Sequence, residues 1–187
     1  YAWEPEKGVH IGIMPRNGSV KDLRWFKGDP SFVFHPMNAH TDNNIVTCDV
    51  CEFEQAPLFP WADGTPGDPS KAVPRLTRWK FDLAANTDEF KSERLDDLAC
   101  EFPRLDERFT ATNYRYGFFA ADNNPKFKVG GFNGIGRVDH ESGNTEIHDV
   151  GEACATNEPI FVPKSEDSPE GEGFVLANVY DANRKAS

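Results

Sequence analysis

The chain has 187 residues, of which 38% are hydrophobic and 27% charged, a balance that favours a globular protein over a disordered one. Its formal net charge of -11, with no Lys/Arg cluster, disfavours nucleic acid as a partner. No apolar run is long enough to span a membrane, and residues 1–8 lack the features of a secretion signal. Because the first residue is not Met, we expect both ends to be cuts within a longer protein.

The cysteines are Cys48, Cys51, Cys100 and Cys154. A chain with this core content does not need disulfides, so reduced thiols and a cytoplasmic location are expected. Cys48 and Cys51 have the spacing of a zinc knuckle. Residues three apart on a strand point to opposite faces, however, and no second pair follows, which disfavours zinc.

Short strands of period two are predicted along most of the chain, beginning with a hairpin. Asn17-Gly18 predicts the turn between strands at 9–14 and 19–26. The next segment, "FVFHPMNAHTDNNIVTCD", places His35 at the end of an aromatic strand that Pro36 is expected to stop. The chain then turns through Asp42-Asn43-Asn44 and returns as a strand that ends near Phe53.

Residues 54–73 are rich in Pro, Gly and Asp and predict a long loop. Both a functional cover and a surface insertion explain such a loop. The strand after it, "PRLTRWKFDL", alternates an aromatic face with a charged one. The two faces are Thr77, Trp79 and Phe81 against Leu76, Arg78 and Lys80.

The second half of the chain predicts further strands between turn signals. These strands are "YRYGFFAA", "FKVGGFNGIGRVD", "TEIHDV", "EPIFVPK" and "GFVLANVYD". The turns are Asn123-Asn124-Pro125, Ser142-Gly143-Asn144 and Ser168-Pro169-Glu170-Gly171. The glycines of 130–136 open no helix, so they predict close strand packing or bulges and not a phosphate loop. Many short strands separated by turns predict an all-β protein.

Histidine and glutamate carry the main chemical signals, because no signature of a nucleophilic enzyme is present. Imidazole is a common ligand for Zn, Fe and Cu, although a lone His on an aromatic strand is more often a hydrogen-bonded core residue. Glu101 and Glu158 each lie beside apolar strand residues and need a partner there. An imidazole N–H or an arginine satisfies that need, and the candidate arginines are Arg104, Arg108 and Arg115.

Three segments together resemble the carotenoid cleavage oxygenase family, also called the retinal pigment epithelial membrane protein family. "FVFHPMNA" resembles its F-x-F-H-x-x-N-A segment. "CEFPRLDERF" followed by "YRYGF" resembles EFPRI and YRYxY, and "NEPIFVPK" followed by "EGEGFVLANVYD" resembles xEPxFVPR and EDDGYLLxxVYD. The motifs follow the family's order over nearly the whole chain, and residues 48–60 are similar to its bacterial branch, which includes lignostilbene and apocarotenoid dioxygenases.

The resemblance implies a seven-bladed β-propeller with a helical cap and long loops on the capped face. Residues 1–187 would form a single-domain part of it, truncated at both ends and covering roughly three to four blades. Family members hold one Fe(2+) with four histidines, three of which hydrogen-bond to glutamates. By motif, His35 is the third ligand in chain order, Glu101 is its partner, and Glu158 orients a last ligand beyond Ser187.

One departure from the family pattern follows the first motif. Many relatives have an aromatic residue and then Glu after the "NA", where this chain has His40, Thr41 and Asp42. His40 is interpreted as a local substitution and not as a second ligand. The other histidines match no ligand motif and are expected to be ordinary surface or strand residues, namely His10, His140 and His148.

The implied activity is oxidative cleavage of a conjugated C=C bond with O2 to give aldehyde or ketone products. Substrates of the family include carotenoids, apocarotenoids, stilbenes and phenylpropenes such as isoeugenol. Phe59 and Trp61 are candidates for a substrate tunnel or its cover, although core packing explains them equally well. The other partner is the remainder of the propeller, contact with a membrane surface stays open, and the fragment alone is expected to be inactive. The alternative is an iron-free or truncated propeller that binds ligands without catalysis.

Overall fold

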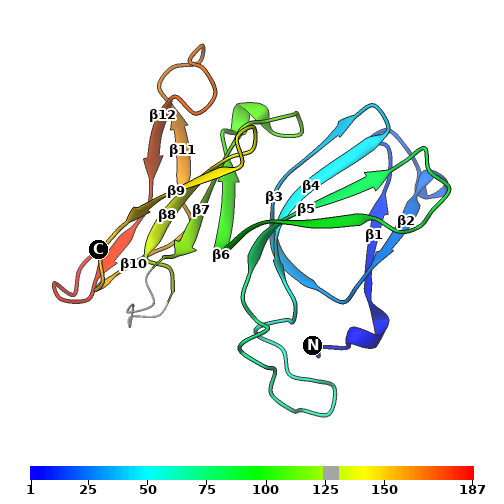
Figure 1. The fold of residues 1–187 in the computed structure, drawn as a ribbon, viewed down its shortest axis with the longest axis horizontal. Coiled ribbons are helices and arrows are strands. Elements are labelled where there is room, and N and C mark those ends of the chain that lie inside the picture. The colour runs from blue at the N-terminus through cyan, green and yellow to red at the C-terminus, as the bar shows by residue number, and fades with distance from the viewer. Residues whose placement is uncertain (124–130) are drawn as a thin grey trace.

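The computed structural model describes residues 1–123 and 131–187, which form an all-β fold (Figure 1). Three short 3-10 turns accompany the strands, Pro5–Lys7, Val20–Asp22 and Glu107–Phe109. Among the described residues, no helix is long and apolar enough to cross a membrane. The strands are β1 (Val9–Ile13), β2 (Arg24–Gly28), β3 (Phe32–Asp42), β4 (Ile45–Phe53), β5 (Arg75–Asp82), β6 (Lys91–Leu105), β7 (Tyr116–Asp122), β8 (Gly134–Asp139), β9 (Asn144–Asp149), β10 (Cys154–Thr156), β11 (Ile160–Pro163), β12 (Gly173–Leu176) and β13 (Val179–Asp181).

The main sheet is antiparallel and follows the chain order from β3 to β9. Strand β6 belongs to two groups of strands, as Figure 1 shows by its course between them. Residues before 95 pair mainly with β5, and residues after 98 pair with β7. The sheet therefore consists of two four-stranded units, β3–β6 and β6–β9, which share β6.

The described residues also form three two-stranded sheets, β1–β2, β10–β13 and β11–β12. The hairpin predicted at Asn17-Gly18 is confirmed, but its second strand begins only at Arg24. Ser19 caps a 3-10 turn there, because its hydroxyl accepts from the backbone and Asp22 reaches back to the Ser19 N–H. This capping box delays the return strand.

Strand β3 is longer than the sequence predicts. Pro36 was expected to stop it, yet Pro36 pairs with Val50 and the strand continues to Asp42. The register shifts on both sides of Pro36, so the residue without an N–H lies where the ladder is already interrupted. His35 is consequently inside an irregular part of β3 and not at its end. The predicted turn after the strand is confirmed, with Asn43 at a φ of 52°.

Two hydrophobic cores lie on opposite faces of the sheet. One contains Phe26, Val50, Trp79 and Phe81, and the other contains Met37, Cys51, Leu76, Cys100, Leu105, Tyr114, Phe119, Ala121 and Val138. The aromatic face predicted for β5 is buried. The opposite face of β5 is only partly exposed to solvent, because Leu76 is completely buried and Arg78 is half-buried. Cys48 packs against the first core and Cys51 against the second, which confirms that they point to opposite faces.

The turns and glycines agree with the sequence wherever they are described. Residues 54–73 form a loop without a strand, and the turns at Gly143 and Gly171 are present, both at positive φ. On β8, a Cβ at Gly136 would overlap the ring of Phe119, which explains the close approach of the strands there. The predicted turn at 123–125 and the beginning of the predicted strand 127–139 fall on residues 124–130, outside the described residues.

Candidate metal centre

His35 and Glu101 come from the two units of the main sheet and meet where their strands are irregular. His35 lies within the first register shift of β3, between Val33 and Pro36, and Glu101 is the last paired residue before the register shift between β6 and β7. The Nδ1 atom of His35 lies 2.7 Å from Oε2 of Glu101. The Glu101 side chain is buried, with 6% of its surface exposed, whereas 45% of the His35 side chain is exposed.

This contact determines which nitrogen of His35 carries a proton. An ionised carboxylate only accepts hydrogen bonds, so Nδ1–H is the donor to Glu101. A neutral imidazole then has its lone pair on Nε2, the nitrogen that faces away from the carboxylate. Such a carboxylate partner fixes the tautomer and raises the basicity of a histidine that ligates a metal.

Phe102 contacts both members of the pair. Its backbone N–H donates to the same Oε2 of Glu101 at 2.6 Å. Its ring lies against the His35 ring, with centroids 5.4 Å apart and planes inclined by 38°. The other oxygen of Glu101, Oε1, is buried and has no hydrogen-bond partner among the described residues. The carboxylate is thus held through a single oxygen that accepts two donors.

Aromatic side chains continue from His35 toward the long loop. Phe34 lies 6.1 Å from the imidazole ring, Phe32 lies 4.6 Å from Phe34, and Phe59 of the loop lies 5.7 Å from Phe32, all between ring centroids. Phe59 therefore joins an apolar group that includes Phe34, the residue next to His35. Trp61 is 38% exposed and is tied to the chain start through a backbone bridge to Trp3.

Glu158 lies just before β11 and is half-exposed, with 47% of its side-chain surface accessible. Its Oε1 accepts a hydrogen bond from Nη1 of Arg104 at 3.0 Å. Arg104 also binds Glu107, at 2.6 Å. The sequence left an imidazole or an arginine open as the partner of Glu158, and the structure shows that Arg104 is in contact with it. The role that the resemblance assigns to Glu158, orienting a ligand beyond Ser187, stays a prediction.

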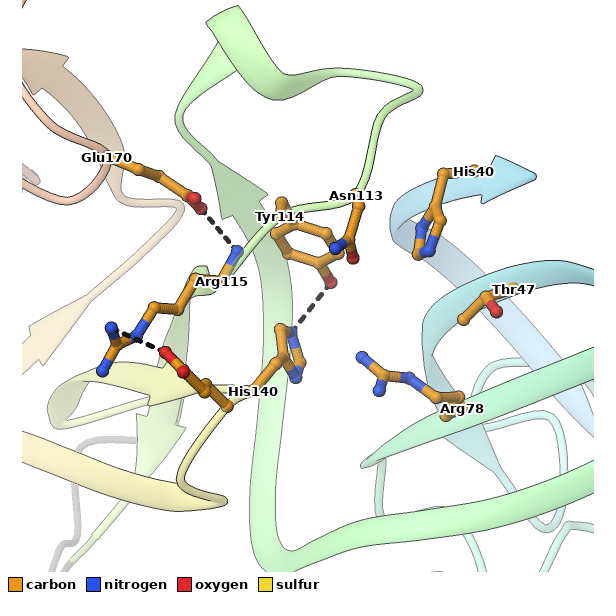
Figure 2. Close-up of a pocket in the computed structure, with 9 residues that line it drawn as sticks. His40, Thr47, Arg78, Asn113, Tyr114, Arg115, His140 and Glu170 are labelled. Atoms are coloured by element: carbon orange, nitrogen blue, oxygen red, sulfur yellow. Dashed lines mark hydrogen bonds and ion pairs between the residues drawn. The ribbon is translucent and has the colours of Figure 1, made fainter. Parts of the chain in front are cut away.

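A polar pocket of about 430 Å³ is lined by His40, near the C-terminal end of β3. Figure 2 shows that the polar ends of His40, Arg78, Tyr114 and His140 face the same space. His40 is five residues along the strand from His35, roughly 16 Å at the usual rise. The pocket and the His35 centre are therefore separate. The Nδ1 atom of His40 is buried and has no partner among the described residues.

Behind this pocket lies a buried network that the sequence did not predict. Asp49 accepts two hydrogen bonds from Arg78, at 2.7 and 2.8 Å, and one from the hydroxyl of Tyr114, at 2.6 Å. Since the Tyr114 hydrogen points to Asp49, its oxygen accepts from Nε2–H of His140, at 2.9 Å. His140 was expected to be an ordinary surface or strand residue, yet only 6% of its side chain is exposed.

Burial and neighbouring charges shift the pKa values in this network. Burial alone would raise the pKa of Asp49, but the hydrogen bonds from Arg78 and Tyr114 outweigh it and hold the pKa below its usual value. Burial lowers the pKa of His140 to about 4, against the opposing effect of Asp49. His140 is thus neutral at pH 7, as its donor role toward Tyr114 requires only one proton on the ring.

The low pKa of His140 predicts acid sensitivity. In the unfolded chain the group takes up a proton near pH 6.5, but in the folded protein only near pH 4. The unfolded state therefore binds more protons between these values, and stability should fall by roughly 3 kcal/mol as the pH decreases from 6.5 to 4. His140→Gln, which keeps an N–H donor but does not titrate, should flatten this slope in urea unfolding measured across that range. His148→Gln, at an exposed position on β9, should leave the slope unchanged. An equal slope in wild type and His140→Gln would contradict the assignment.

The chain matches the family model described as retinal pigment epithelial membrane protein over residues 1–187. It is 40% identical to an isoeugenol monooxygenase of Pseudomonas putida, over 96% of this chain and 39% of that protein. It is 36% identical to lignostilbene-alpha,beta-dioxygenase isozyme III of Sphingomonas paucimobilis, over 91% of this chain and 38% of that protein. The chain thus spans less than half the length of these relatives.

Solved structures give the same result for the fold. A lignostilbene dioxygenase of Pseudomonas brassicacearum superposes with a TM-score of 0.91 at 31% identity, over 98% of this chain and 41% of that one. Cobalt-substituted ACO of Synechocystis superposes with a TM-score of 0.81 at 26% identity, over 97% of this chain and 37% of that one. The all-β fold is accordingly a part of a larger propeller, as the sequence predicts.

Proposed function

Because the chain belongs to the retinal pigment epithelial membrane protein family, the carotenoid cleavage oxygenases, we propose that its intact protein is a non-haem iron(II) dioxygenase that cleaves a conjugated C=C bond. The observation that supports this most strongly is the hydrogen bond from Nδ1–H of His35 to buried Glu101. This bond leaves the lone pair of Nε2 available to a metal. The remaining ligands would come from residues outside this chain.

The residues fit an iron ligand and its support. A neutral imidazole suits Fe(II), and its carboxylate partner is the usual means of orienting such a ring. His35 is accessible enough to bind a metal, while Glu101 is shielded from water. Iron, when bound, would supply an open coordination position at which O2 is activated. In this proposal His35 binds the metal, Glu101 keeps the ring in one tautomer, and Glu158 supports a ligand beyond Ser187.

The aromatic group beside His35 suggests the substrate class. Phe32, Phe34 and Phe59 would offer flat apolar surfaces for a conjugated substrate and would limit the access of water. The relatives named above are an isoeugenol monooxygenase and a lignostilbene dioxygenase. We therefore assign a small phenolic alkene, a phenylpropene or a stilbene, ahead of a carotenoid. Trp61 is retained as a cover residue on the loop.

The intact protein should be tested with isoeugenol, a hydroxystilbene and an apocarotenal under O2, with aldehyde products measured by chromatography. We expect cleavage of at least one phenolic alkene and a lower kcat/KM for the apocarotenal. An iron-loaded protein that cleaves only the apocarotenal would overturn the substrate assignment. A protein that purifies without metal, and gains no activity when iron is added, would instead support a binding module.

Glu101→Gln tests the supporting carboxylate. The amide keeps the shape of the side chain but removes the charge that stabilises Nδ1–H of His35, so iron should be retained about 10- to 100-fold less strongly and turnover should slow in proportion. Iron content after dialysis against a chelator measures this directly. Exposed Glu146→Gln, on β9, is the matched control and should behave as wild type. Unchanged iron retention in Glu101→Gln would remove this residue from the site.

A further inference from the structure

Phe102 has an unusual backbone for a phenylalanine. Its φ is +53°, in the left-handed region that residues with a side chain seldom adopt. Pro103 follows it, and a residue before proline favours an extended conformation. The conformation is therefore strained, and strain of this kind persists only where surrounding contacts hold it.

The strained residue lies where strand pairing is interrupted. In the register of β6 with β7, Glu101 pairs with Ala120 and the next pair is Arg104 with Phe118, so residues 102 and 103 are left out. Pro103 has no N–H to donate, whereas the N–H of Phe102 is released from the ladder. That N–H turns back onto Oε2 of Glu101, the atom that accepts from His35.

We infer that Phe102 is a positioning residue, whose left-handed backbone fixes Glu101 and, through it, the imidazole of His35. Oε1 of Glu101 has no partner among the described residues, so His35 and Phe102 supply the two hydrogen bonds found on this carboxylate. Without the Phe102 N–H, the carboxylate would be held by the imidazole alone and could rotate away. The inference rests on the proposed function, because it concerns the orientation of a metal ligand.

The decisive variant replaces the peptide bond between Glu101 and Phe102 by an ester, which keeps the phenyl side chain, removes the N–H and makes the Glu101 carbonyl a weaker acceptor. In the intact protein we expect the dissociation constant for cobalt(II) to rise about 10-fold, with altered visible absorption bands of the bound metal. The same ester at Phe90 is the control. Phe90 follows the bridge between Lys27 and Glu89, and its ring packs in the core of Trp79 and Phe81, not against His35 or Glu101. That control should bind cobalt as wild type does.

A double substitution shows whether residue 102 acts through Glu101. In the Glu101→Gln background, the ester should weaken cobalt binding by less than about twofold further, because its route to His35 is already lost. Wild-type cobalt affinity of the single ester variant would overturn the inference. The inference would also be overturned if the fold-losses of cobalt affinity in the two single variants multiply in the double variant. Residue 102 and Glu101 would then act independently.

Ordinary substitutions provide a second test that does not depend on the ester protein folding. Phe102→Gly keeps the N–H and adopts positive φ without strain, so cobalt affinity should stay within about threefold of wild type. Phe102→Val resists positive φ and should lose about 10-fold. Equal affinities in these two variants would contradict a backbone role. His35→Ala separates this outcome from failure of the proposed function: wild-type cobalt affinity there would remove the metal site itself.

Discussion

His35→Ala is expected to abolish tight iron binding and to reduce oxygenase turnover by at least about 100-fold. The loss should exceed that of Glu101→Gln, because this change removes the nitrogen that we propose as the metal ligand itself. Oε2 of buried Glu101 would also lose one of its two hydrogen-bond donors. Iron content of the purified intact protein and steady-state rates with a phenolic alkene measure the two effects.

His148→Ala is the matched control for this prediction. His148 is exposed on β9, within the same sheet, and should retain wild-type iron and turnover. His40→Ala should also retain iron, because His40 lies at the polar pocket. Full iron occupancy in His35→Ala would refute the ligand assignment, whereas iron loss in His40→Ala would mean that the family arrangement of ligands is altered in this protein.

Asp49→Ala is expected to have the largest effect on stability, about 3–5 kcal/mol of destabilisation. It would leave the guanidinium of Arg78, whose side chain is only 19% exposed, without its charge partner. It would also remove the acceptor of the buried Tyr114 hydroxyl. The midpoint of urea unfolding should decrease at neutral pH, where the lowered pKa of Asp49 keeps the native carboxylate ionised.

An exposed ion pair provides the comparison for Asp49. Glu172 contacts Lys164 at the end of the β11–β12 hairpin, and both side chains are accessible, so Glu172→Ala should change the midpoint very little. The double variant Asp49→Ala with Arg78→Met should recover part of the lost stability, since no unpaired buried charge remains. A midpoint in Asp49→Ala within error of wild type would show that the network contributes little to folding.

The sequence predicted most of the strands because period-two alternation and turn residues are local signals. It did not predict β6, whose first half reads "KSERLDD" and shows no apolar alternation. That half is a mostly exposed strand, and its position depends on pairing with β5, which no local pattern specifies. Pro36 was misjudged for a related reason, because the register shifts around it are a property of the pairing between β3 and β4.

The candidate site was only partly accessible from sequence. Motif resemblance pointed to His35 and Glu101, which are 66 residues apart in sequence and which the structure brings into contact. The network around Asp49 carried a usable signal that was overlooked. Thr47, Asp49 and Cys51 are alternate residues of β4 and all are buried, so the Asp49 carboxylate needs a partner. Arg78 pairs with Asp49 on the neighbouring strand β5. The strained backbone of Phe102 had no signal beyond the proline that follows it.

The most direct test is a crystal structure of the intact protein loaded with Fe(II), with the metal located by its anomalous scattering. The account predicts an iron peak within bonding distance of Nε2 of His35, with Nδ1 still hydrogen-bonded to Glu101. An iron peak elsewhere, or a His35 ring turned away from both the metal and Glu101, would contradict it.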